Sequence, residues 1–298
     1  MPALTLLVDG PSLIYRSHFA MREGIFAADG SPIAAAHGFL SMLARLIADL
    51  KPVRLVTALD ADWRPDWRVD LVPEYKTHRL APENEAVDDV IDVQTELIAR
   101  ILKLARVAAV GAPGCEAEDV IATLLTRVRG RVSIVSGDRD LFQLVRDPDV
   151  VVLYPKRGVS DLARIDEAEI TRRYNVPGRA YADFAILRGD PSDGLPGVRG
   201  VGEKTAAMLI AKYGSLEAVV AASAGARSGP LAKVAADADY VRRAAEVVRM
   251  KGDCSVGEVD MTLGGAPSPK LKALAKQYSL TGPVNRLLAA IPRSAPRE

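Results

Sequence analysis

Apolar residues fall into two kinds of run along this chain, and their order predicts an alternating α/β architecture. Short β-rich runs lie near residues 4–8, 53–59, 106–110, 131–135 and 149–154. Longer segments with helical spacing of apolar positions lie near 34–50, 87–105 and 116–129. Strands that alternate with helices are typical of βαβ units with right-handed crossovers. We therefore expect a mostly parallel central sheet flanked by helices.

The pattern changes beyond about residue 175. The later segments are rich in Ala, Leu and Arg with helical periodicity, and only 256–263 suggests a strand. We therefore expect an α/β domain over residues 1–175 and a helical lobe over 176–298 that packs on the sheet. A chain of 298 residues is long enough for both parts and for a sizeable core. Residues 292–298 should form a frayed tail.

Composition narrows the classes of protein that fit. The chain has 49% hydrophobic and 26% charged residues, and no apolar run approaches the length that crosses a bilayer. No secretion signal is evident, so we expect no association with a membrane. Cys115 and Cys254 are far apart and have no metal-binding spacing, and a reducing cytoplasm is the simplest expectation.

The net charge of +1 hides an asymmetry between the two parts. Residues 1–194 carry 24 Lys and Arg against 29 Asp and Glu, a net of −5, and residues 195–298 carry 15 against 9, a net of +6. An acidic first part and a basic second part fit a metal site beside a module that binds a nucleic-acid backbone. Chance variation in surface charge is the alternative.

Nine acidic residues stand where the predicted elements would bring them together. They are Asp9, Asp60, Glu116, Glu118, Asp119, Asp138, Asp140, Asp190 and Asp193. Four of them follow strand runs, at the edge where open parallel sheets bind their ligands. So many carboxylates can share a small space only when cations neutralise them, and Mg²⁺ or Mn²⁺ suits oxygen ligands. Carboxylates that hold two such ions commonly cut phosphodiesters.

Each acidic set also has a purely structural explanation. Acidic residues in a first helical turn are favoured by the helix dipole, which could account for Glu116 to Asp119. Aspartates are common turn formers, which could account for Asp190 and Asp193. The order of all the motifs together favours a metal site.

The connection over residues 60–86 is too long for a compact sheet and lacks clear apolar periodicity. It contains both tryptophans of the chain beside several cations, among them Arg64, Arg68, Lys76 and Arg79. Aromatic and basic side chains in one segment suit stacking on bases and pairing with phosphates. A partly ordered surface loop is the alternative.

A glycine-rich loop at residues 197–202 precedes a helix predicted to begin at Glu203, and Gly214 and Ser215 mark the start of a second helix. Such a loop offers backbone N–H groups to a phosphate at a helix N-terminus. No strand precedes the loop, so a mononucleotide site is disfavoured. Recognition of a DNA backbone is favoured over a helix hairpin that has no ligand.

Together these motifs resemble the 5′-nuclease family: bacterial and phage 5′→3′ exonucleases, the 5′-nuclease domain of DNA polymerase I, and flap endonucleases. The resemblance covers the chain from Leu4 to Leu288, and its motifs follow the family order. They are residues 7–10 with Tyr15 and Arg16, 75–79, 115–120, 137–141, and 189–193 before the glycine loop. Without a polymerase part the chain resembles the free-standing form, although a piece cut from a fusion would look the same.

The resemblance implies a site for two divalent ions. On the family pattern Asp9, Asp60, Glu116 and Glu118 hold or orient the first ion. The second ion and its waters are served by Asp119, Asp138, Asp140, Asp190 and Asp193. Two Mg²⁺ or Mn²⁺ ions about 3.5–4 Å apart would generate hydroxide and clamp the scissile phosphate.

The resemblance also assigns roles to cations and glycines. Arg16, Arg68 and Lys76 match cations that steady the phosphate. Residues 60–86 would form an arch for a free 5′ end, with Lys76 and Arg79 on the DNA. A helix-loop-helix of the helix-hairpin-helix type at residues 195–222 would hold the downstream duplex, and a K⁺ ion can sit among its carbonyls. Its DNA-binding residues would be Gly197, Gly200, Gly202, Lys204 and Thr205.

Two departures from the family pattern leave details open. Glu118 stands where aspartate is more usual, so its metal contact could pass through water. Asp60 and Asp62 are both candidates for one ligand, and the spacing from Asp60 to Arg68 is one residue longer than the commonest.

The sequence thus predicts a monomeric, divalent-metal-dependent 5′-nuclease that acts on flap, nicked or 5′-ended DNA in replication and repair, with RNA-primed DNA as a further substrate. A non-catalytic binder of DNA structures is one alternative, which the intact acidic set disfavours. A related ribonuclease is another, which the helical lobe disfavours. The balance of exonuclease and flap endonuclease activity, the preferred ion and the order of the arch without DNA stay open.

Overall fold

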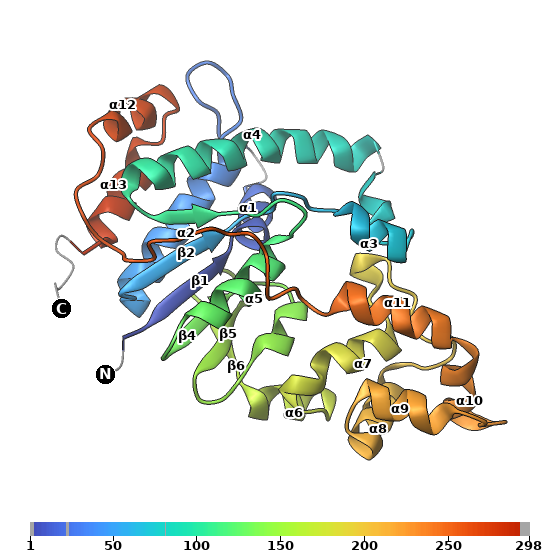
Figure 1. Ribbon diagram of the computed structural model, residues 1–298. Coiled ribbons are helices and arrows are strands. Elements are labelled where there is room, and N and C mark those ends of the chain that lie inside the picture. Colours follow the sequence, from blue (N-terminus) through green and yellow to red (C-terminus); the bar gives the residue numbers. More distant parts are fainter. Residues whose placement is uncertain (1–2, 22–23, 81, 293–298) are drawn as a thin grey trace.

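The computed structural model describes residues 3–21, 24–80 and 82–292, and within them a six-stranded sheet forms the centre of the molecule (Figure 1). The strands are β1 (Thr5–Asp9), β2 (Arg54–Ala58), β3 (Ala108–Val110), β4 (Val132–Val135), β5 (Val150–Pro155) and β6 (Leu162–Ile165). Their order is β3-β2-β1-β4-β5-β6; the first five pair in parallel, and β6 pairs antiparallel with β5. The predicted mostly parallel sheet is confirmed.

The central strand β1 brings the ends of its neighbours into register. Its residues are all buried, as expected for an apolar run covered on both faces. Asp9 lies opposite Ala58 of β2, and Val8 lies opposite Val135 of β4. The carboxyl ends of β1, β2 and β4 therefore meet at one edge of the sheet.

Helices cover both faces of the sheet, and a further group of helices lies beyond one side of it (Figure 1). The helices are α1 (Gly10–Ala20), α2 (Ala34–Leu50), α3 (Asp66–Leu71), α4 (Pro82–Ala105), α5 (Ala117–Arg127), α6 (Glu167–Tyr174), α7 (Tyr181–Arg188), α8 (Glu203–Tyr213), α9 (Leu216–Ser223), α10 (Gly229–Ala236), α11 (Ala238–Val248), α12 (Lys270–Gln277) and α13 (Thr281–Ala290). Short 3₁₀ helices span Thr77–Leu80, Asp140–Leu144, Gly178–Ala180 and Pro191–Asp193.

Alternate residues of β1 point into two separate cores. Leu6 and Val8 join a cluster with α1, α2 and α4, whereas Leu7 joins a cluster with α5 and α7 to α11. This division follows from the period of two in a strand. A sheet covered by helices on both faces, with further helices beside it, agrees with the predicted fold class.

The last two helices do not lie with the predicted lobe over 176–298. Helix α13 packs on α2 and α12 packs on α4, on the other side of the sheet from α8 to α10 (Figure 1). Leu271, Leu280 and Val284 are buried in the cluster of α1, α2 and α4. Helical periodicity predicts such helices but does not reveal which surface their apolar stripe covers.

Two strand assignments differ from the prediction. Residues 256–263 are extended but form only an isolated bridge between Thr262 and Arg54, so the expected strand is wrong. This segment meets the start of β2 through just two backbone hydrogen bonds, from Leu55 to Met261 and from Leu263 to Val53. Strand β6 was not predicted, because it is short and three of its four residues are partly or fully exposed. Residues 293–298 of the expected tail lie outside the described residues.

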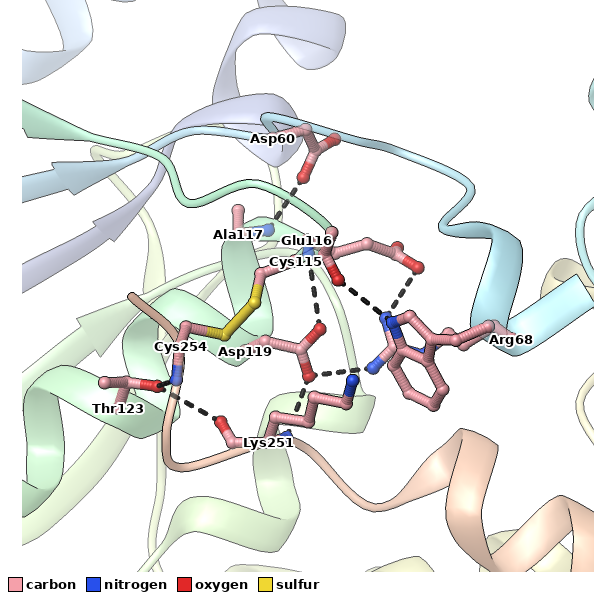
Figure 2. Close-up of a disulfide and its surroundings, with 11 residues drawn as sticks. Asp60, Arg68, Cys115, Glu116, Ala117, Asp119, Thr123, Lys251 and Cys254 are labelled. Atoms are coloured by element: carbon pink, nitrogen blue, oxygen red, sulfur yellow. Dashed lines mark hydrogen bonds and ion pairs between the residues drawn. A yellow bond between two sulfur atoms is a disulfide. The ribbon is translucent and has the colours of Figure 1, made fainter. Parts of the chain in front are cut away.

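Cys115 and Cys254 form a disulfide across 139 residues of sequence (Figure 2). The sequence analysis expected a reducing cytoplasm and did not predict this pairing, since spacing along a chain does not reveal which segments the fold brings together. In the described part of the chain no single helix is long and apolar enough to cross a membrane. Helices α8 and α9 pass that test jointly by length and composition, with a bend of 92° between them.

Candidate active site

A cavity of about 440 Å³ opens at the edge of the sheet where β1, β2 and β4 end. Five of the nine predicted acidic residues line it: Asp9, Asp60, Glu116, Glu118 and Asp138. The rest of its wall includes the cations Lys76 and Arg79 and the aromatic side chains of Tyr15, Phe19 and Trp63. The fold therefore brings together residues that lie far apart in the sequence.

Asp9, the last residue of β1, is held by hydrogen bonds from the first turn of α1 and from the residue that follows β4. It caps α1 through a hydrogen bond that its Oδ1 accepts from the Ser12 backbone N–H at 3.2 Å. Its Oδ2 accepts a hydrogen bond from the Ser136 hydroxyl, and the same hydroxyl accepts from the Asp138 N–H at 2.8 Å. Ser136 thus couples Asp9 to Asp138. Sequence reasoning missed this residue, although its place between β4 and Asp138 was the available signal.

Asp60 connects the end of β2 to the start of α5. Its Oδ1 accepts a hydrogen bond from the Ala117 backbone N–H at 2.8 Å, which directs the carboxylate to the cavity. Asp62 instead accepts from the Arg64 N–H at 3.2 Å. Of the two candidates for one ligand, Asp60 is the one that lines the cavity.

Glu116 lies at the centre of a polar network at the N-terminus of α5. Its carboxylate accepts hydrogen bonds from Arg68 at 2.7 Å, from the Tyr75 hydroxyl at 2.7 Å, and from the Lys76 ammonium. Burial alone would raise the pKa of Glu116, but the positive charges of Lys76 and Arg68 hold that pKa below its usual range. Glu116 is therefore ionised at neutral pH.

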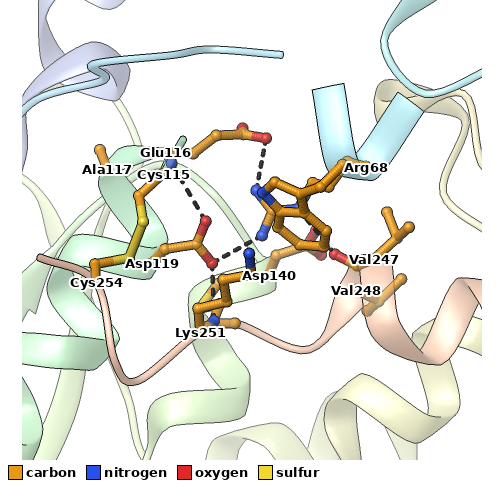
Figure 3. Close-up of polar contacts among 12 residues, drawn as sticks. Arg68, Cys115, Glu116, Ala117, Asp119, Asp140, Val247, Val248, Lys251 and Cys254 are labelled. Atoms are coloured by element: carbon orange, nitrogen blue, oxygen red, sulfur yellow. Dashed lines mark hydrogen bonds and ion pairs between the residues drawn. A yellow bond between two sulfur atoms is a disulfide. The ribbon is translucent and has the colours of Figure 1, made fainter. Parts of the chain in front are cut away.

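Arg68 and Asp119 are directed at each other rather than at the cavity (Figure 3). Asp119 contacts the Arg68 guanidinium at 2.8 Å and also accepts from the Lys251 N–H at 2.9 Å and the Glu116 N–H at 3.2 Å. Arg68 donates in addition to the Val247 carbonyl at 3.1 Å. These contacts use the polar atoms of both side chains, so the structure does not bring either one to the wall of the cavity at the sheet edge.

The second acidic set lies beside the first. Asp140 and Asp193 line a small recess next to the cavity, and they share it with Glu118. The Asp140 N–H donates to Asp138 Oδ1 at 2.8 Å. Asp190 is buried and turned to Ser192 at 2.9 Å and to Arg188 at 3.2 Å, so it shapes the turn and lines neither space.

A close backbone approach joins Lys76 to the Asp193 turn. The Lys76 N–H donates to the Asp193 carbonyl at 2.9 Å, and Arg79 contacts the Asp193 carboxylate at 3.6 Å. Gly194 makes this approach possible because a Cβ there would lie 2.3 Å from the Glu74 carbonyl oxygen. The turn thus positions the lysine among the carboxylates.

The charge of the acidic set is only partly balanced by the protein. Burial raises the pKa of Asp9 to about 7, and Asp138 adds to this rise against the hydrogen bond from Ser136. Burial likewise raises the pKa of Asp60 to about 6, and the positive charge of Lys76 opposes the rise. Glu118 and Asp140 have pKa values well above the usual range, first through burial. Carboxylates that resist ionisation together are the donor set that a divalent cation would neutralise.

The acidic side chains lie near one another but do not surround a single position where an ion could bind. Over residues 3–21, 24–80 and 82–292, no three His, Cys, Asp or Glu side chains are gathered tightly enough to hold one ion as they stand. The Lys76 ammonium lies among them, on Glu116. Arg16 lies near the same edge, because a Cβ on Gly137 would be 3.1 Å from its guanidinium.

The segment over residues 60–80 is braced against the core. Helix α3 occupies Asp66–Leu71, and Arg64 donates to the Tyr75 carbonyl at 2.7 Å and to the Pro73 carbonyl at 3.2 Å. Of the predicted arch over 60–86, residue 81 and the side chains of 82–86 lie outside the described residues. Helix α4 begins at Pro82.

The glycine loop enters α8 as predicted. Gly202 is the N-cap of α8, and Ser215 caps α9 through a hydrogen bond from the Ala218 N–H at 3.2 Å. Gly200 is exposed with φ of 75°, and its carbonyl accepts from the Lys233 ammonium at 2.8 Å. Gly197 is buried, and its N–H donates to the Tyr240 hydroxyl at 2.9 Å.

The predicted DNA-binding residues of this loop therefore divide into two groups. Gly200, Gly202 and Lys204 are exposed and Thr205 is half-buried, so these four lie at the surface of the loop and the first turn of α8. Gly197 instead packs inside, where a Cβ would lie 2.5 Å from the Arg188 backbone.

Two family models cover most of this chain. The model described as "5'-3' exonuclease, N-terminal resolvase-like domain" matches residues 4–175, and the model described as "5'-3' exonuclease, C-terminal SAM fold" matches residues 176–266. The chain belongs to the 5′-3′ exonuclease family. The resemblance drawn from the motifs is thereby confirmed.

Individual proteins agree with this membership. A 5'-3' exonuclease of Streptomyces coelicolor is 43% identical and covers 96% of this chain and 99% of its own length. A 5'-3' exonuclease of Mycobacterium tuberculosis is 42% identical, with coverage of 96% and 97%. The flap endonuclease of bacteriophage T5, solved in a complex with DNA and metal ions, has a TM-score of 0.66 at 17% identity, with coverage of 96% and 98%, and shares the fold.

Proposed function

We propose that this member of the 5′-3′ exonuclease family is a divalent-metal-dependent 5′-nuclease. It hydrolyses phosphodiester bonds in flap, nicked or 5′-ended DNA, both as an exonuclease and as a flap endonuclease. The observation that carries the proposal is the group of carboxylates at the edge of β1, β2 and β4, with the Lys76 ammonium among them.

The donor set divides into two groups for two Mg²⁺ or Mn²⁺ ions. Asp9, Asp60, Glu116 and Glu118 would hold one ion, and Asp138, Asp140 and Asp193 the other. When bound, the ions supply a hydroxide at neutral pH and neutralise charge on the scissile phosphate. Asp119 and Asp190, which the sequence placed in the second group, would act through Arg68 and through the turn before Gly194.

Lys76 and Arg16 are the cations proposed to act on the phosphate. Lys76 reaches the cavity from the base of the arch, so a phosphate brought onto the carboxylates would meet its ammonium. Arg68 has no such access and positions Glu116 instead. Arg79, which lines the same cavity, would contact the DNA strand that passes the arch.

The glycine loop is proposed to bind the phosphate backbone of the duplex. Exposed N–H groups at the N-terminus of α8, together with Lys204 and Thr205, suit a phosphate and carry no base code. A K⁺ ion at this loop stays a proposal as well. The Gly200 carbonyl already accepts from the Lys233 ammonium, so an ion that used this carbonyl would compete with that lysine.

The biological setting follows from this activity. DNA is the partner, replication and repair are the processes, and removal of RNA primers lies within the same chemistry. We infer that the protein acts as a monomer in the cytoplasm, where its substrate would be found.

Cleavage of a 5′-flap duplex labelled at both ends of the flap strand tests the proposal. Release of the intact flap in Mg²⁺ indicates endonuclease action, release of mononucleotides indicates exonuclease action, and a chelator should abolish both. An RNA strand in place of the flap separates a ribonuclease from the proposed enzyme. Binding of the flap duplex without cleavage in either Mg²⁺ or Mn²⁺ would establish the non-catalytic alternative.

A further inference from the structure

The disulfide joins the candidate active site to a distant segment of the chain. Cys115 directly precedes Glu116, whereas Cys254 lies in residues 249–256, an extended segment between α11 and the bridge at Thr262 (Figure 2). We call residues 249–256 the strap. Both cysteines are buried, with 4% and 5% of their surface exposed.

The strap is held on α5 and its surroundings by single hydrogen bonds, and at its first residue by ion pairs of Arg249 with Asp183 at 2.8 Å and with Glu217 at 2.5 Å. The Lys251 N–H donates to Asp119 at 2.9 Å, and the Cys254 N–H donates to the Thr123 hydroxyl at 3.0 Å. The Met250 N–H donates to Gln143 at 3.3 Å. Beyond Arg249 the strap has no regular ladder of backbone hydrogen bonds, and such a segment opens locally at a lower cost than a helix or a central strand. The disulfide is the one covalent tie among these contacts.

The strap also reaches Glu116 through its neighbours. Asp119 accepts from the strap at Lys251 and from Arg68, and Arg68 donates to Glu116 (Figure 3). The Lys251 ammonium lies 3.5 Å from the centroid of the Trp67 ring, and the Trp67 indole donates to the Gly114 carbonyl beside Cys115. The strap is therefore connected to Glu116 in two ways: through Asp119 and Arg68, and through the disulfide to Cys115, the residue before Glu116.

We propose that Cys115–Cys254 is a reversible redox modification site that sets the affinity of the acidic site for divalent cations. This inference rests on the proposed function. A dithiol protein or two equivalents of a low-molecular-weight thiol supply two electrons and two protons. The S–S bond breaks, each cysteine becomes a thiol, and the reductant becomes a disulfide. Because both sulfurs belong to buried residues, the attacking thiolate gains access when the strap opens.

Loss of the cross-link should loosen the placement of Glu116 rather than unfold the protein. The bond links residues 139 apart in the sequence, and without it the strap depends on its hydrogen bonds and on the ion pairs of Arg249. When the strap opens, Asp119 loses the Lys251 N–H and the brace on Arg68 weakens. Partners of metal-binding groups commonly change metal affinity about 10- to 100-fold when removed outright. A strap that is open part of the time should weaken metal binding by less, about three- to tenfold.

Hydrogen exchange of the metal-free protein tests the structural half of the proposal. The oxidised form should contain no free thiol and the reduced form two, as counted by alkylation and mass spectrometry. On reduction, the amides of Lys251, Cys254 and Glu116 should exchange about tenfold faster, whereas those of β1 should not change. Unchanged exchange at the strap would overturn the proposal.

A double variant provides the matched control. Cys115→Val with Cys254→Val keeps a small apolar side chain at each position and cannot form the bond. It should resemble the reduced wild type, and a reductant should leave its exchange unchanged. If this variant does not fold, the comparison of oxidised and reduced wild type still decides the matter, because it needs no substitution.

Calorimetric titration with Mn²⁺ in the absence of DNA tests the second half. The reduced form should bind Mn²⁺ about three- to tenfold more weakly than the oxidised form. The Mg²⁺ concentration for half-maximal flap cleavage should rise in parallel. Equal Mn²⁺ affinity of the two forms would overturn this inference and leave the nuclease intact. If neither form binds Mn²⁺, the proposed function is overturned together with this inference.

Discussion

The guanidinium of Arg68 meets the carboxylate of Asp119 at 2.8 Å, and each side chain exposes at most 2% of its surface. The family resemblance assigned Arg68 to the scissile phosphate and Asp119 to a metal ion. The geometry instead makes them a buried brace beneath Glu116. A buried pair stabilises the fold only while both partners are present, because either one left without the other is an uncompensated charge.

Replacing one member of this pair should therefore act on stability before it acts on chemistry. Arg68→Met should lower the free energy of unfolding by about 3–5 kcal/mol, measured by urea denaturation. The double variant Arg68→Met with Asp119→Leu should recover part of that loss, because it leaves no buried charge unpaired but removes the acceptor of the Lys251 and Glu116 N–H groups. An unchanged urea midpoint for Arg68→Met would show that the arginine has no bracing role.

Lys76 should behave differently, because its ammonium lines the cavity. Lys76→Ala should slow single-turnover cleavage at saturating flap DNA. The activation free energy should rise by about 2.7–4 kcal/mol, the scale for loss of one hydrogen-bond donor to a transition state. Lys76→Arg should restore part of the rate, since a forked guanidinium does not replace a point charge fully. Lys204→Ala, at the exposed glycine loop, is the control: it should weaken binding and leave the single-turnover rate near that of the wild type. Wild-type single-turnover rates for Lys76→Ala would contradict the assignment.

Asp138 provides the cleanest test of the acidic site. Asp138→Asn should remove most cleavage and retain DNA binding, because the charge is needed for metal ions rather than for folding. Its hydrogen bond to the Asp140 N–H can be kept by the amide oxygen. Asp149→Asn, at an exposed position directly before β5, should leave turnover unchanged. The measurement is cleavage in Mg²⁺ beside the affinity for the uncut flap, and near-normal turnover would refute the assignment.

The sequence predicts which strand-end aspartates lie at the edge of the sheet, but it does not assign the partners of the acidic residues. Strand-end aspartates such as Asp9 and Asp60 follow from the βαβ pattern, because the carboxyl ends of parallel strands meet at one edge. The partners of Arg68 depend on how α3, α5 and α11 approach in space, which periodicity does not specify. The same limit applies to the disulfide, whose two cysteines are 139 residues apart. Residues 270–290 were predicted as helical, yet the surface they cover was not.

The raised pKa values of the acidic site give a stability that depends on pH. Burial raises the pKa of Asp9 to about 7 and that of Asp60 to about 6, above the values in the unfolded chain. Between about pH 4 and 7 the folded protein therefore binds more protons than the unfolded chain, and its stability falls as the pH rises through this window. The metal-free protein should melt at a lower temperature near pH 8 than near pH 5.5.

A variant and an added cation test the origin of this dependence of melting temperature on pH. Asp9→Asn cannot ionise and should flatten it. Mg²⁺ should raise the melting temperature more at the alkaline end, where the carboxylates are ionised and bind the cation. The metal-free wild type could instead melt at a temperature that rises steadily from pH 5.5 to 8, by about as much as in Asp9→Asn. That result would contradict a pKa of Asp9 raised by burial.

The glycine loop should contribute affinity and no sequence preference. Gly200 has φ of 75°, and a Cβ there would lie 2.9 Å from the Lys233 ammonium, so Gly200→Val should strain the loop and displace the lysine. Duplex binding should weaken about equally for all sequences, and the affinity of the wild type should fall steeply with salt because bound phosphates release counterions. Gly225→Val is a matched control, since Gly225 has φ of 76° and open space around it, outside the loop. It carries a similar backbone strain and should leave binding unchanged. Fluorescence anisotropy with flap duplexes and with single strands measures both variants, and equal affinity of the wild type for the two kinds of DNA would show that the loop does not hold the duplex.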